Sequence, residues 1–131
     1  MTQEEKELLL KDICSRLPYG VKGVNTAGIV SSPSDWNCAF DILSGLKYRI
    51  EGSKWKPYLF PLSSMTEEQR GEYNGWKHLI PVCHYEYGDI VEEYELFDSP
   101  ESFEYLIENH FDYRGLIEKG LAIDATGLGI Y

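Results

Sequence analysis

Basic residues are missing from a long stretch of this sequence, because no lysine or arginine occurs between Lys77 and Arg114. The same 36 residues contain ten carboxylates, which are Glu86, Asp89, Glu92, Glu93, Glu95, Asp98, Glu101, Glu104, Glu108 and Asp112. Residues 1 to 62 hold 7 acidic and 8 basic residues, a net charge of +1, whereas residues 63 to 131 hold 15 and 4, a net charge of −11 that accounts for the whole −10 of the chain. Segregated charge bears on partner choice and association rate rather than on catalysis.

Long hydrophobic runs are absent too. The longest are a handful of residues, whereas a membrane-spanning helix needs about 20. Residues 1 to 12 also lack the basic start and the apolar stretch of a signal peptide. The three cysteines, Cys14, Cys38 and Cys83, are widely spaced and form no CxxC motif, which suits reduced thiols. We therefore expect a soluble, cytoplasmic protein that does not bind a membrane.

Motifs that would hold a cofactor are missing as well. Neither GxxxxGK[ST] nor GxGxxG occurs, so no nucleotide site is indicated. The candidate metal donors are poorly spaced, and neighbours in a strand, such as Cys83 and His84, point to opposite faces. We expect neither a cofactor nor a metal, and the sequence assigns no catalytic residue.

What the chain does contain is enough apolar sequence for one folded domain, with 43% hydrophobic residues. Thr2 and Glu5 form a capping box, and apolar residues at helical spacing then predict a helix over 3–17. From residue 21 the spacing of the apolar residues changes to a period of two, which is typical of a strand. This predicts a hairpin over 21–24 and 28–30 and a strand over 38–43.

A second hairpin is predicted from strands at 46–50 and 54–60, which flank the link Glu51-Gly52-Ser53. Pro57 has no N–H to donate, so this last strand is expected at a sheet edge or at a bulge.

The acidic half also shows clear element signals. A capping box at Thr66 predicts a helix over 67–73, and alternation predicts a strand over 78–87. Residues 90–97 fit either a strand or a helix, and we favour the strand. Ser99 and Pro100 begin a further helix, and 121–124 is a candidate terminal strand. The predicted fold is α+β, a single domain over 1–131 with an N-terminal helix, an antiparallel β-meander and a late C-terminal helix.

Three segments carry a resemblance to a known family: LPYGVK at 17–22, KPYLFPLSSMTEE at 56–68 and FDYRGLIEKGLAID at 111–124. They resemble an uncharacterised family of small proteins from gut Bacteroidales and their phage-like mobile elements. The resemblance covers most of the chain. It implies a source and brings no reaction, ligand or catalytic residue with it.

The leading functional hypothesis is a noncatalytic accessory protein of a phage or mobile element that binds a basic protein partner. The predicted binding surface is acidic and comprises Glu92, Glu93, Glu95, Glu101, Glu104 and Glu108. Closely spaced carboxylates accelerate association with a cationic patch. Glu86 and Asp89 are assigned to a strand end and a turn, and Arg114 to a local ion pair with Asp112 or Asp124.

A second surface is the predicted basic aromatic hairpin, formed by Lys47, Arg49, Lys54, Trp55, Lys56 and Tyr58. Aromatic residues among cations are typical of single-stranded nucleic-acid binding. Four cations on a chain of net charge −10 disfavour direct binding of nucleic acid. The hairpin could instead dock against the acidic half, within one chain or in a self-associated dimer.

Two other functions stay open. The acidic surface could mimic nucleic acid and inhibit a DNA-binding or defence enzyme. The chain could also be a small enzyme whose site is assembled across the fold, with a histidine or carboxylate beside Cys14, Cys38 or Cys83.

Overall fold

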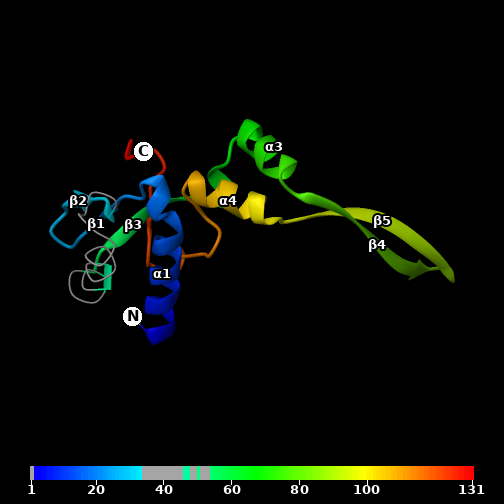
Figure 1. The fold of residues 1–131 in the computed structure, drawn as a ribbon, viewed down its shortest axis with the longest axis horizontal. Helices are drawn as coiled ribbons and strands as arrows, with labels where there is room; N and C mark the ends of the chain where they lie inside the picture. The colour runs from blue at the N-terminus through cyan, green and yellow to red at the C-terminus, as the bar shows by residue number, and fades with distance from the viewer. Residues whose placement is uncertain (1, 34–45, 48–49, 51–53) are drawn as a thin grey trace. The chain divides into compact units, whose positions relative to one another are not determined.

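The computed structural model describes residues 2–33, 46–47, 50 and 54–131 (Figure 1). Their contacts divide the chain into two compact units. Met1–Ser64 and Ile107–Tyr131 form the first, here called the core unit, and Met65–Leu106 form the second, the hairpin unit. Helices and sheets are both present, so the predicted α+β class is confirmed. The single domain stays a prediction.

The N-terminal helix of the core unit, α1, spans Gln3–Arg16. Its capping box forms as predicted, because the Thr2 hydroxyl accepts a hydrogen bond from the Glu5 amide at 3.1 Å and the Glu5 carboxylate accepts one from the Thr2 amide at 3.2 Å. A short 3₁₀ turn, η1 (Leu17–Tyr19), follows and ends at Gly20, whose φ of 70° requires a residue that tolerates the left-handed region. The predicted helix is confirmed to within one residue.

Among the described residues, the sheet of the core unit contains five short strands. These are β1 (Gly23–Val24), β2 (Val30–Ser31), β3 (Lys56–Pro61), β6 (Phe111–Asp112) and β7 (Ile123–Asp124). β1 pairs antiparallel with β2, which confirms the first predicted hairpin, and antiparallel with β3. On its other side β3 pairs in parallel with β7 and then with β6. The parallel pairs add long-range connections that a meander does not contain.

The position of β3 corrects the prediction made from Pro57, because β3 lies in the middle of the sheet. The backbone N–H of Tyr58 points to β1, where it donates to the Lys22 carbonyl at 2.8 Å. Successive nitrogens of a strand alternate sides, so the nitrogen of Pro57 faces β7, and pairing with β7 begins only at Tyr58. A proline is tolerated there because no neighbour requires its N–H.

The first arm of the second predicted hairpin, at 46–50, is also wrong. Leu46, Lys47 and Ile50 are helical, and Leu46 and Ile50 are both buried. Two apolar residues four apart share a face in a strand and in a helix, so this spacing did not separate the two structures. The predicted strand over 38–43 and the link at 51–53 lie outside the described residues.

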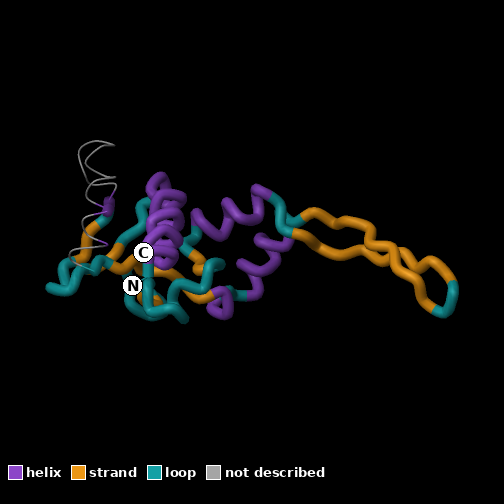
Figure 2. Tube along the Cα trace, turned by 90° about the horizontal axis from the view of Figure 1, so that it is seen from below, coloured by secondary structure: helices purple, strands orange, loops and turns teal. Residues whose placement is uncertain are grey.

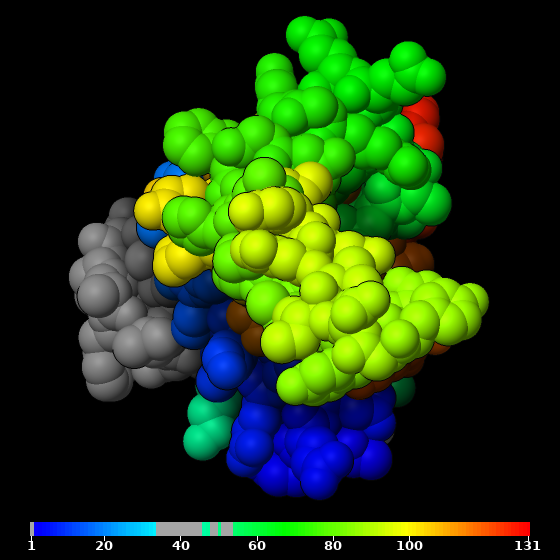
Figure 3. All heavy atoms as spheres, turned by 90° about the vertical axis from the view of Figure 1, so that its right-hand side faces the viewer, coloured from blue at the N-terminus to red at the C-terminus, as the bar shows by residue number. Residues whose placement is uncertain are grey.

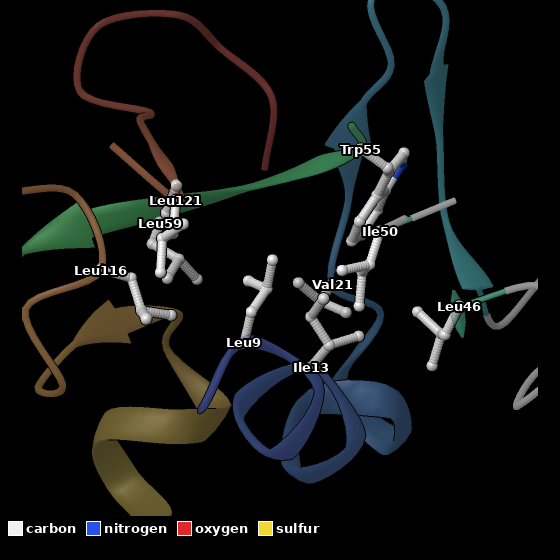
Figure 4. Packing of buried hydrophobic residues seen from close by; sticks show 10 residues of the cluster. Leu9, Ile13, Val21, Leu46, Ile50, Trp55, Leu59, Leu116 and Leu121 are labelled. Atoms are coloured by element: carbon white, nitrogen blue, oxygen red, sulfur yellow. The ribbon is translucent and has the colours of Figure 1, made fainter. Parts of the chain in front are cut away.

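The core lies between α1 and the sheet. Figure 4 shows Leu9 and Ile13 of α1 directed toward Val21, Trp55, Leu59 and other buried apolar side chains of the core unit. Trp55 is completely buried, and its ring lies against β1. A Cβ at Gly23 would approach this ring to 2.2 Å, so only glycine fits at that position.

In the hairpin unit, α3 (Glu67–Gly75) begins at the predicted capping box of Thr66 and Gln69. Strands β4 (His78–Glu86) and β5 (Asp89–Phe97) then form a two-stranded antiparallel sheet, and α4 (Pro100–Glu108) follows. The Ser99 hydroxyl caps α4 by accepting from the Ser102 amide at 3.1 Å. These elements confirm the predictions, and 90–97 is a strand. Figure 2 shows the two strands side by side with a marked twist.

Candidate functional site

The β4–β5 hairpin has two chemically different faces. Cross-strand partners share a face, and successive pairs alternate between the faces. One face carries the pairs Leu79 with Leu96, Pro81 with Tyr94, Cys83 with Glu92, and Tyr85 with Ile90. The other carries the pairs His78 with Phe97, Ile80 with Glu95, Val82 with Glu93, His84 with Val91, and Glu86 with Asp89.

The first face is apolar apart from Glu92, and we call it the apolar face. Its large side chains are exposed: Tyr85 by 79%, Ile90 by 67%, and Leu79 and Tyr94 by 61% each. Most residues over 78–97, drawn in yellow-green to yellow in Figure 3, are exposed. Contiguous exposed apolar side chains mark interaction sites in folded proteins.

The second face gathers four carboxylates, Glu86, Asp89, Glu93 and Glu95, and we call it the acidic face. Within the described part of the chain, the ion pair recorded for these carboxylates joins His84 Nε2 to Glu86 Oε2 at 3.7 Å. The contact is an ion pair only when the histidine is protonated. The other three carboxylates therefore offer their charge to the solvent, or to a cation brought by another molecule.

The six glutamates of the predicted acidic surface are divided among three places. Glu93 and Glu95 lie on the acidic face of the hairpin, whereas Glu92 lies on the apolar face. Glu101, Glu104 and Glu108 lie along one side of α4, because they are three and four residues apart, and all three are exposed. Hydrogen bonds from its own backbone amide and from Ser99 lower the pKa of Glu101. Their role in binding a partner stays a prediction.

The predicted basic aromatic hairpin does not present its aromatic rings. Trp55 belongs to the core, where its Nε1 donates to the Ser31 hydroxyl at 3.3 Å, and Tyr58 is buried in β3. Lys47 is helical and exposed, and Arg49 lies outside the described residues. Neither ring can stack on a base in this fold, because packing against the core covers both of them.

A buried charge network was not predicted. Asp12 and Arg16 of α1 are both inaccessible, and Arg16 Nε lies 2.9 Å from Asp12 Oδ2. Arg114 Nε reaches Asp12 Oδ1 at 3.2 Å, so Arg114 pairs with Asp12 and the predicted pair with Asp112 or Asp124 is wrong. Asp112 instead accepts from the Leu116 and Ile117 amides, each at 2.9 Å. The spacing of four residues between Asp12 and Arg16 indicates that the two side chains can pair on one side of a helix, but it does not indicate that they are buried.

The cysteines lie in different settings. Cys14 is partly buried, and burial raises the pKa of its thiol, which disfavours the nucleophilic thiolate. Cys83 is exposed on the apolar face. Among the described residues, no three His, Cys, Asp or Glu side chains lie close enough together to hold a metal ion. None of the helices in the described part of the chain has the length and the apolar character of a membrane-spanning segment.

Comparisons with protein-family models, with curated proteins and with solved structures give no match for this chain. The resemblance to proteins of gut Bacteroidales therefore stays a prediction.

Proposed function

We propose that this protein is a noncatalytic accessory protein that binds a basic protein partner, and that the β4–β5 hairpin is its binding element. The observation that carries the proposal is the exposed apolar face of a two-stranded sheet whose opposite face is acidic. A cytoplasmic location and an origin in a phage or mobile element belong to the same proposal.

The hairpin has the properties of a surface that is completed by a partner. An isolated two-stranded sheet is marginally stable in water. In the described structure, β4 and β5 pair only with each other, and Tyr85, Ile90, Tyr94 and Leu79 remain exposed. Burying a large apolar side chain contributes roughly 1.5–3 kcal/mol, so a partner that covers this face stabilises both the complex and the hairpin.

The acidic residues supply the preference for a basic partner. Residues 78 to 113 contain ten carboxylates and no lysine or arginine. Such a field attracts a cationic surface and accelerates the encounter, and salt screens the attraction over about 8 Å at physiological ionic strength.

Affinity capture with matched variants tests the proposal. The bait is the full chain, and the variant Tyr85→Ser/Tyr94→Ser removes two aromatic rings from the apolar face. We expect this variant to recover at least about tenfold less of a directly bound basic protein than the unchanged chain does. Leu128→Ser, which also removes an exposed apolar side chain but lies in the core unit, should retain the partner.

The same capture at low and high salt tests the electrostatic part. We expect recovery of the partner to fall as salt rises. Recovery that is independent of both salt and the two tyrosines would exclude the hairpin as the binding element.

A further inference from the structure

The turn of the hairpin fixes which backbone groups of each strand face outward. Tyr87 and Gly88 form a two-residue turn with φ angles of 52° and 85°, the combination of a type I′ turn. The hydrogen bond of such a turn joins the residues on either side of it, so Glu86 and Asp89 are a hydrogen-bonded pair. Hydrogen-bonded and non-hydrogen-bonded pairs alternate along an antiparallel ladder. In Glu86, in Asp89 and in every second residue counted from them, the backbone N–H and C=O groups therefore point to the other strand. In the residues between, these backbone groups point outward, away from the other strand.

The outer edge of β4 is interrupted by Pro81. Pro81 pairs with Tyr94, five positions from the turn pair, which is a non-hydrogen-bonded position. Its nitrogen faces outward and carries no hydrogen, so β4 lacks a donor at the centre of its free edge. Prolines at such positions block the addition of another strand.

The outer edge of β5 is open. By the same alternation, Ile90, Glu92, Tyr94 and Leu96 direct their N–H and C=O groups away from β4. Within the described part of the chain, these outward groups make no backbone hydrogen bond, because β5 pairs only with β4. β5 thus presents a continuous row of donors and acceptors, and its edge contains no proline.

We propose that β5 binds an extended segment of the partner as an added third strand, and that this segment alternates apolar with basic residues. The inference rests on the proposed function and specifies how the partner is held. An added strand continues both faces of the sheet. Its apolar side chains would extend the apolar face beside Ile90 and Tyr94, and its lysines or arginines would lie beside Asp89, Glu93 and Glu95 on the acidic face.

Charge favours this occupant over a second copy of the same chain. Two β5 strands paired with each other would bring Glu92, Glu93 and Glu95 of one copy against the carboxylates of the other, and like charges in facing positions destabilise a sheet. A basic segment meets the same carboxylates with opposite charge. Pairing through β4 would place Pro81 at the centre of the new ladder.

A peptide probe tests the added strand. The probe is a short acetylated peptide in which valine and lysine alternate over the length of β5, and the control peptide alternates valine and glutamate. Both are titrated to about 1 mM, where even weak binding registers, against the isotope-labelled full chain by NMR. We expect the lysine peptide to shift and protect the amides of Ile90, Glu92, Tyr94 and Leu96, and the glutamate peptide to leave them unchanged. Absence of these changes with the lysine peptide, or equal changes with both peptides, overturns the proposal.

Two substitutions at one position isolate the backbone donor. Glu92→Thr removes the charge and keeps the N–H, whereas Glu92→Pro removes both, at the type of position where Pro81 is already accommodated in β4. We expect Glu92→Pro to bind the lysine peptide about tenfold more weakly than Glu92→Thr, with the β4–β5 contacts intact in both NMR spectra. Equal affinities overturn the added strand. If captured partners then still depend on Tyr85 and Tyr94, the proposed function stands without it.

Discussion

Asp12 is the residue on which two arginines of the core unit converge. Its carboxylate faces Arg16 at 2.9 Å and Arg114 at 3.2 Å, and Arg16 also donates to the Phe111 carbonyl at 2.6 Å. The contacts connect α1 to the segment that contains β6 and Arg114. Buried ion pairs add little net stability, because desolvation offsets their attraction, but removing one member leaves an uncompensated charge.

Substitution of Asp12 should therefore be strongly destabilising. In Asp12→Ala the guanidinium of Arg16 would stay buried without its counter-charge, and we expect the free energy of unfolding to fall by about 3–5 kcal/mol. Urea denaturation followed by circular dichroism measures the change. Lys11→Gln, at the exposed neighbouring position, should change it by less than about 0.5 kcal/mol. Similar values for the two variants would contradict the structural role of the network.

His110 makes the stability of the core unit depend on pH. Its ring stacks on Tyr131 with centroids 3.8 Å apart, and its Nδ1 is buried without a hydrogen-bond partner. Burial lowers the pKa of His110 from 6.5 to about 4, and the charges of Arg16 and Lys22 act in the same direction. The folded state therefore resists protonation over a pH range in which the unfolded chain accepts a proton.

The sign of the effect follows from this difference. The folded pKa is depressed, so the unfolded state binds the extra proton, and stability should be lost as the pH falls from about 6.5 toward 4, by on the order of 2 kcal/mol. Unfolding in urea at several pH values measures the slope. His110→Asn, which suits the φ of 61° at this position, should flatten it, and the exposed His78→Asn should not. A slope that is equal in all three proteins would refute this account.

The turn of the β4–β5 hairpin contains a backbone conformation that its sequence does not favour. Tyr87 adopts a φ of 52° with 97% of its side chain exposed. A left-handed backbone costs roughly 1–2 kcal/mol for an ordinary residue, and asparagine tolerates it better. The hairpin thus forms in spite of Tyr87 and with the help of Gly88.

Opposite changes in the turn should therefore move hairpin stability in opposite directions. We expect Tyr87→Asn to slow amide exchange at Val82 and Glu93 by about fivefold, and Gly88→Ala, at a φ of 85°, to accelerate it by a similar factor. Gly71→Ala in α3 serves as the control, because its added Cβ meets no atom within 4 Å. Equal changes in amide exchange for all three substitutions would show that the turn does not determine the stability of the hairpin.

The sequence predicted elements with strong local signals. Capping residues located the starts of α1, α3 and α4, and alternation located β4 and β5. The prediction failed for Leu46 and Ile50, because a spacing of four residues fits both a strand and a helix. It also failed for Trp55, because tertiary packing determines whether this ring is buried or exposed. The two faces of the hairpin needed the cross-strand register, which depends on the turn at Tyr87 and Gly88.

The hydrophobic cluster and the excess of negative charge lie in different parts of the chain. The described hydrophobic cluster, which includes Leu9, Ile13, Trp55 and Leu116, lies entirely in the core unit. Five carboxylates and no lysine or arginine lie in 79–96, within the hairpin. A single deletion of the hairpin should therefore abolish partner binding and leave the stability of the core unit nearly unchanged.

The deletion replaces residues 79–96 with Asn-Gly, because His78 and Phe97 are directly paired and a tight turn can join them. It changes the net charge from −10 to −5, since five carboxylates are lost. We expect the melting temperature to stay within about 4 °C of the parent and partner capture to disappear. A large fall in the melting temperature would show that the core unit needs the hairpin in order to fold.

Pro81 also determines how copies of this protein behave at high concentration. A hairpin with two open edges can join the next hairpin on each side and grow into an endless ribbon, the geometry of a fibril. Growth of that kind needs every molecule to present two joinable edges, and Pro81 interrupts one of them. The hairpin can thus expose apolar side chains and one open edge without offering the second open edge that this kind of polymerisation requires.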